Sequence, residues 1–291
     1  MPSNAPRRLP PAVGKAIVVA GLGIYAAALA VVTVGNHGQI RYTADSGDTI
    51  PLWQVLLPVA IGLGLMLLIP PGPPQATGAR TFPRLRTEAF ALLAAGLAFT
   101  IALTLLGPEE PRYILLKLLL LLIAPLTLFA ATRRREHTPS GTVDPAASTL
   151  TRAQWRPLLP AAGWILCYLI LSATRPSQSL GLDLPTLVAA LAIGFLLNAV
   201  LEEVFYRRWL QTRWEHLLGG VWPAIILTSI LWSSWHIAIQ GGGNLGADLA
   251  NVVANQGITG LFLGLLWARY RAMWPLLVIH GLMNANPLAL L

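Results

Sequence analysis

The chain has 291 residues, of which 55% are hydrophobic and only 11% are charged, and its mean hydropathy is +0.63. Soluble domains carry roughly 25% charged residues, so this composition excludes a soluble globular enzyme and a disordered protein. A single cysteine, Cys167, excludes an intramolecular disulfide framework. The net charge of +8 comes as short basic clusters between apolar runs, so no nucleic-acid partner is expected. The sequence predicts a polytopic membrane protein with the lipid bilayer as its surroundings.

Apolar stretches of about 20 residues, the length that crosses a bilayer core, follow one another along the chain. They cover residues 13–34, 51–70, 88–106, 112–131, 157–174, 184–206, 221–239, 248–268 and 272–290. The predicted fold is all-α, a membrane bundle of 8–9 transmembrane helices, because the first half of 248–268 is too polar to face lipid. The first stretch exceeds the apolar core of a signal peptide, so we expect it to be an uncleaved span.

Basic residues determine the expected orientation. With a cytoplasmic N-terminus, 16 Lys and Arg fall in connections on the cytoplasmic side and 3 on the other, while Lys117 lies inside a span. The polar connection 132–156 is predicted to be a cytoplasmic linker between an N-terminal four-helix membrane region, 1–131, and a C-terminal membrane core, 157–291. The excess of Arg over Lys and the lack of N-glycosylation sequons favour a bacterial inner membrane.

Two adjacent carboxylates lie in apolar sequence, where an ionisable group costs about 2.5–3.5 kcal/mol on insertion scales and is a functional candidate. Helical spacing places Glu203 and Arg207 on one face, where they can pair. Glu202 points about 100° away, toward the face of Asn198 and Tyr206. One carboxylate is then neutralised and the other is free to act. Taken alone, the pair also fits two acids solvated at a helix end.

Two later apolar stretches carry histidines. His236 comes late in the seventh stretch, and His280 and Asn284 lie four residues apart in the last, so both can donate toward one point. Each also fits a packing role, the role to which we assign Asn251 and Asn255. Together, three spans supply the carboxylate, imidazole and neutral donors that hydrolysis of a peptide bond requires.

These residues resemble the motifs of the CPBP or Abi intramembrane proteases, a family that includes CAAX prenyl endopeptidases and bacteriocin-processing proteins. The family pattern is Glu-Glu-x-x-x-Arg, then Phe-x-x-x-His, then His-x-x-x-Asn. The matching residues are Glu202, Glu203 and Arg207, then Trp232 and His236, then His280 and Asn284. Trp232 stands where the family usually has Phe, and one aromatic ring for another should keep its packing role. The resemblance covers about 155–291 and leaves the first four spans unexplained.

The resemblance implies an intramembrane endopeptidase that acts on a membrane-associated peptide or protein without a cofactor. Glu202 would be the general base, His236 would hold the attacking water, and His280 and Asn284 would bind the developing oxyanion. It also implies that the two remaining motif residues, Glu203 and Arg207, support the site as an ion pair.

Other functions stay open at this point. Glu202, His236 and His280 are a possible zinc set, which predicts a metalloprotease that uses the same residues. A non-enzymatic immunity or scaffold protein is a further alternative, and a proton-coupled transporter is a weaker one because the spans show no inverted repeat.

The predicted spans also raise a difficulty. Glu202 falls near the inner end of its span, and His236 falls near the outer end of the next. A common site therefore requires a tilted, interrupted or re-entrant helix, which we expect around Gly219-Gly220 and Trp222-Pro223.

Overall fold

The computed structural model describes residues 8–43, 47–69, 84–134, 155–173 and 182–285. These residues are almost entirely helical, as the all-α prediction requires, with one short hairpin of two strands. The elements are α1 Pro11–Ala30, η1 Val31–Gly35, β1 Gln39–Arg41, β2 Thr49–Pro51, α2 Trp53–Leu68, α3 Leu85–Leu106, α4 Arg112–Lys117, η2 Leu118–Ile123, α5 Ala124–Arg134, α6 Leu158–Ser172, α7 Leu184–Gly194, η5 Phe195–Val200, α8 Leu201–Glu203, η6 Val204–Gln211, α9 Thr212–Leu218, α10 Val221–Ser234, α11 Ile237–Gln240, α12 Leu245–Val252, η7 Val253–Gly257, α13 Ile258–Tyr270 and α14 Trp274–Asn284, where η marks π-helical turns.

Six of the described helices are long and apolar enough to cross a membrane. They are Pro11–Gly35, Leu85–Leu106, Arg112–Thr132, Leu184–Leu218, Val221–Gln240 and Leu245–Tyr270. The apolar helices Trp53–Leu68 and Leu158–Ser172 are shorter. These helices make the chain an integral membrane protein, and the count of 8–9 transmembrane helices stays a prediction.

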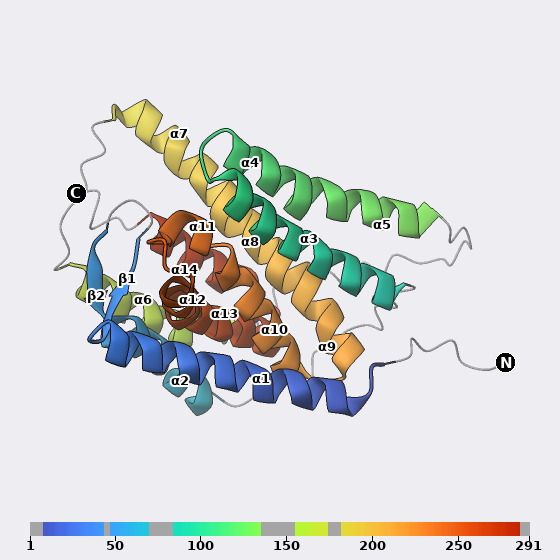
Figure 1. Cartoon of the computed structure of the whole chain (residues 1–291), viewed down its shortest axis with the longest axis horizontal. Coiled ribbons are helices and arrows are strands. Elements are labelled where there is room, and N and C mark those ends of the chain that lie inside the picture. The colour runs from blue at the N-terminus through green and yellow to red at the C-terminus, as the bar shows by residue number, and fades with distance from the viewer. Residues whose placement is uncertain (1–7, 44–46, 70–83, 135–154, 174–181, 286–291) are drawn as a thin grey trace.

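The helices pack in layers around one long helix, which runs from α7 through α8 to α9 across the whole molecule (Figure 1). Helix α3 and the α4–α5 helix lie on one side of it, and α10, α13 and α14 lie on the other (Figure 1). Helix α1 packs against the outer side of α10, and α2 packs against α6. One apolar core joins residues from both halves of the chain, so the N-terminal helices pack directly on the C-terminal ones.

Glycines allow neighbouring helices to approach closely, which is how helices associate where lipid is as apolar as their side chains. A Cβ on Gly21 of α1 would lie 2.1 Å from a side-chain carbon of Ile226 in α10. A Cβ on Gly163 of α6 would lie 2.1 Å from a side-chain carbon of Leu65 in α2. Both crossings therefore depend on the missing side chain.

The long helix corrects one predicted boundary. The stretch predicted to end at 206 continues to Leu218, where Gly219 turns the chain in a left-handed conformation with φ of 68°. Glu202 thus lies about 16 residues before this turn and His236 about 15 residues after it, which is about 23 Å of helix on each side. The two residues reach the same depth through an ordinary helical hairpin. The expected irregularity at Gly219-Gly220 is this turn, and the interruption of the following helix lies at Trp235 and His236 instead.

The ends of the predicted bundle differ in detail. Helix α14 ends at Asn284, earlier than the predicted 290, and 286–291 lie outside the described residues. Most of the predicted linker, 135–154, also lies outside them.

The polar half of the predicted span 248–268 is covered by protein. Asn255 Nδ2 donates to the Arg41 carbonyl of the hairpin at 3.1 Å, and Gln256 Nε2 donates to Gln240 Oε1 at 2.9 Å. This agrees with the packing role expected for Asn255.

Candidate active site

The two adjacent glutamates lie in the middle of the long helix, in the three-residue segment α8 between the π-helical segments η5 and η6. A π-helical turn changes the angular register of the side chains that follow it, and such turns occur often at functional sites. Both side chains are buried, with exposed fractions of 1% for Glu202 and 0% for Glu203. A buried carboxylate needs a cation or several hydrogen-bond donors, and each of the two has its own set.

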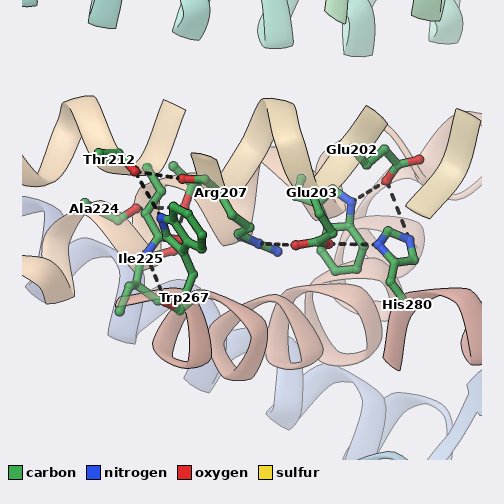
Figure 2. A network of polar contacts seen from close by, with 12 residues as sticks. Glu202, Glu203, Arg207, Thr212, Ala224, Ile225, Trp267 and His280 are labelled. Carbon is green, nitrogen blue, oxygen red and sulfur yellow. Dashed lines mark hydrogen bonds and ion pairs between the residues drawn. The ribbon is translucent and has the colours of Figure 1, made fainter. Parts of the chain in front are cut away.

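Glu203 lies between a cation and a histidine (Figure 2). Arg207 Nε donates to Glu203 Oε2 at 3.2 Å, which confirms the pairing expected from the i,i+4 spacing. His280 Nδ1 lies 2.8 Å from Glu203 Oε1, so the histidine donates from Nδ1 and its Nε2 faces away from Glu203. The Arg207 guanidinium also lies over the ring of Trp232, 5.3 Å from its centre. Glu203 therefore orients His280, and Arg207 holds Glu203.

Glu202 accepts hydrogen bonds on both oxygens. Trp232 Nε1 donates to its Oε2 at 2.6 Å, and Lys117 Nζ donates to its Oε1 at 2.6 Å. His280 Nε2 lies 3.9 Å from Oε2, too far for a direct hydrogen bond and close enough for a bridging water. Glu202 was expected to be the carboxylate without a cation, and that expectation is wrong because Lys117 pairs with it.

His236 lies at the interruption between α10 and α11. Its Nδ1 is 3.1 Å from the carbonyl oxygen of Trp232, one turn earlier, so Nδ1 donates there and Nε2 remains an acceptor. The imidazole stacks on Trp235 with ring centres 3.8 Å apart. The Trp232 ring makes edge contacts with His236 and with His280, at 5.3 Å between ring centres in both cases. Trp232, in the position the resemblance gives to Phe, thus joins the two histidines to Glu202.

The structure brings most of the predicted site residues into one buried cluster. Glu202, Glu203, Arg207 and His280 are in direct contact or separated by less than 4 Å, and His236 is linked to them through Trp232. Asn284 differs, because it is exposed in the last turn of α14.

Lys117 is the residue that the sequence analysis missed as a member of the site. It was recognised as a charge within a span, and a lone lysine in an otherwise apolar helix is itself a signal of function.

The comparisons with known proteins concern the C-terminal part of the chain. Residues 184–286 match the family model described as Rce1-like, type II CAAX prenyl endopeptidase. These residues form a domain similar to those of CAAX proteases. This domain begins at α7 and contains all the predicted site residues, whereas Lys117 lies outside it. No curated protein and no solved structure gave a significant match. The matched domain and the apolar helices together support an intramembrane endopeptidase as the general class of this protein.

Proposed function

We propose that this protein hydrolyses a peptide bond in a membrane-associated peptide or protein with a water activated by Glu202. The observation that carries the proposal is the meeting of two carboxylates and His280 in one buried cluster, with His236 beside it. A carboxylate base and imidazole groups at one place are the means of general acid–base hydrolysis. Because the site holds two carboxylates and two imidazoles, one group of each pair can react while the other positions it.

Glu202 is the proposed base. A water placed between Glu202 Oε2 and His280 Nε2, which are 3.9 Å apart, can hydrogen-bond to both. Glu202 then accepts a proton from this water as its oxygen attacks the substrate carbonyl, and returns the proton to the leaving amine. Trp232 Nε1, at 2.6 Å from the same oxygen, holds the carboxylate in place.

The histidines and Asn284 have the positioning and oxyanion roles in this proposal. His236 keeps an acceptor at Nε2 because its Nδ1 donates to a backbone carbonyl, so it can hold the water. His280 is aligned by Glu203 and supplies Nε2–H to the oxyanion when it is protonated. Asn284 lies one turn after His280 and is exposed, where it can reach a bound substrate.

The arrangement of the side chains bears on the zinc alternative. Among the residues that the structure describes, no group of three His, Cys, Asp or Glu side chains is arranged to hold a metal ion. The ammonium of Lys117, 2.6 Å from Glu202 Oε1, also gives a cation to the carboxylate that would otherwise bind a zinc ion. These two observations favour hydrolysis without a metal, which is the mechanism that we propose.

The proposed function is tested by replacing Glu202→Gln in the full-length protein, purified and placed in lipid nanodiscs. The probes are quenched fluorescent peptides that span membrane-proximal protein tails, together with a farnesylated peptide ending in Cys-aliphatic-aliphatic-X. We expect the wild type to cleave at least one peptide and Glu202→Gln to cleave it at least about 100-fold more slowly.

The matched control is Glu88→Gln. Glu88 is also a buried glutamate bound to an arginine, with its Oε2 2.6 Å from Arg213 Nε, and it lies outside the proposed site. This variant should cleave the same peptide at a rate near wild type. Equal cleavage by Glu202→Gln and wild type would contradict the proposed mechanism. A membrane proteome in which no precursor accumulates with Glu202→Gln would favour the scaffold alternative.

A further inference from the structure

Lys117 is a fully buried lysine in the first turns of the span Arg112–Thr132. Its Nζ lies 2.6 Å from Glu202 Oε1 and 2.6 Å from Asn198 Oδ1, and it donates a third hydrogen bond to the hydroxyl of Tyr113. An ammonium has three protons, and all three have acceptors here. The ammonium is thus fully coordinated inside the protein, unlike that of a lysine whose side chain extends toward the membrane surface.

Aromatic rings surround the same ammonium. The Nζ atom lies 4.5 Å from the ring centre of Tyr113 and 4.8 Å from that of Trp235, within the range of cation–π attraction. Trp235 is also the ring on which His236 stacks. These contacts hold the cation beside the catalytic groups and keep lipid away from it.

The charge of Lys117 matters because of the second carboxylate. Glu202 and Glu203 are neighbours in a buried segment, and two close carboxylates without enough positive charge share a proton. Arg207 pairs with Glu203, so Lys117 is the cation that faces Glu202. Trp232 Nε1 and His280 Nε2, the latter 3.9 Å away, also surround Glu202. Three further titratable side chains are close enough to interact with it electrostatically: Tyr113, Tyr206 and His236. Removal of Lys117 would leave two carboxylates facing one arginine and one histidine.

We propose that Lys117 is a positioning residue that keeps Glu202 ionised and correctly placed as the base, and that the N-terminal helices are therefore part of the active site. This inference rests on the proposed function. It extends the site beyond the matched domain at 184–286 to α4, and it gives the N-terminal region a role in catalysis.

The direct test reads the protonation of Glu202 by infrared spectroscopy of the full-length protein in nanodiscs. In wild type at neutral pH, we expect no carboxylic acid C=O band from Glu202. In Lys117→Met, such a band should appear. It should be absent from Lys117→Met/Glu202→Gln and from Lys117→Arg, which restores the cation. A Lys117→Met protein without this band at neutral pH would overturn the inference.

The double variant Lys117→Met/Glu203→Gln shows which of the two glutamates carries the proton. Loss of Glu203 removes the competing negative charge, so the band should weaken in this variant while any remainder belongs to Glu202. A band that vanishes in this variant and persists in Lys117→Met/Glu202→Gln would assign the proton to Glu203 and contradict our inference.

The kinetic test uses the peptide that the wild type cleaves. Without Lys117 the carboxylate binds a proton more readily, so the acidic limb of the pH–rate profile should move to higher pH. At neutral pH, cleavage by Lys117→Met should fall at least about tenfold and recover as the pH rises, and Lys117→Arg should keep most of the wild-type rate. A loss that is equal at every pH would indicate a merely structural role and refute the inference.

Failure to fold is also informative. Breaking a buried ion pair by removing one partner leaves an uncompensated charge, whereas removing both charges is far better tolerated. If Lys117→Met does not accumulate, Lys117→Met/Glu202→Gln should recover, and its failure to do so would count against the inference. A different result contradicts the proposed function itself: cleavage of the peptides by Glu202→Gln at the wild-type rate.

Discussion

The ion pair between Arg207 and Glu203 offers the clearest quantitative prediction. Both side chains are buried, and their charged atoms lie 3.2 Å apart. Replacing Arg207→Met leaves the Glu203 carboxylate in the core with His280 as its remaining partner. Breaking such a buried pair costs about 3–5 kcal/mol. At roughly 2–4 °C per kcal/mol, the melting temperature should fall by about 10 °C.

The assay is thermal unfolding of the purified protein, followed by tryptophan fluorescence. The double variant Arg207→Met/Glu203→Gln removes both charges and should regain more than half of the lost stability. The control is Arg112→Met. Arg112 pairs with Glu109 at 3.0 Å, but their side chains are 47% and 71% exposed, so we expect no measurable change. A fall in melting temperature equal to that of Arg112→Met, or a double variant no more stable than the single one, would refute this reasoning.

Three further predictions follow from the packing, the charges and the expected topology. Gly163→Ala should destabilise the protein by about 1–3 kcal/mol in thermal unfolding, because its Cβ would lie 2.1 Å from Leu65; Gly64→Ala, with no atom within 4 Å of the new Cβ, should not. Dialysis against a strong chelator should leave peptide cleavage unchanged, and a loss reversed by zinc would restore the metalloprotease alternative. In a Cys167→Ala background, Arg8→Cys should react with an impermeant thiol reagent only from the cytoplasmic side and Thr49→Cys only from the other, and the reverse pattern would contradict the predicted orientation.

The sequence allowed prediction of contacts that lie within one helix. Glu203 and Arg207 are four residues apart, and helical periodicity alone brings such side chains together. The motif of glutamates, histidines and asparagine likewise indicated the family, which the match at 184–286 bears out. The division into two membrane units and the linker between them stay predictions.

The end of the long helix was harder to predict. Arg207 and Arg213 look like the charged border of a span, and the predicted span stopped at 206 for that reason. In the folded protein Arg207 pairs with Glu203, and Arg213 Nε donates to Glu88 of α3 at 2.6 Å. Because their charges are neutralised inside the protein, the helix continues to Leu218 and places Glu202 at the depth of His236.

Composition and charge spacing alone therefore determined a membrane-embedded helical protein with an adjacent glutamate pair in one of its apolar helices. The tertiary structure decided which cation each glutamate receives. Glu203 has its arginine one turn away in the same helix, but the lysine beside Glu202 comes from 85 residues earlier in the chain. Periodicity relates residues within one helix and carries no information on the distance between helices. The low fraction of charged residues makes each buried charge easy to recognise, and only the packing of the helices shows its partner.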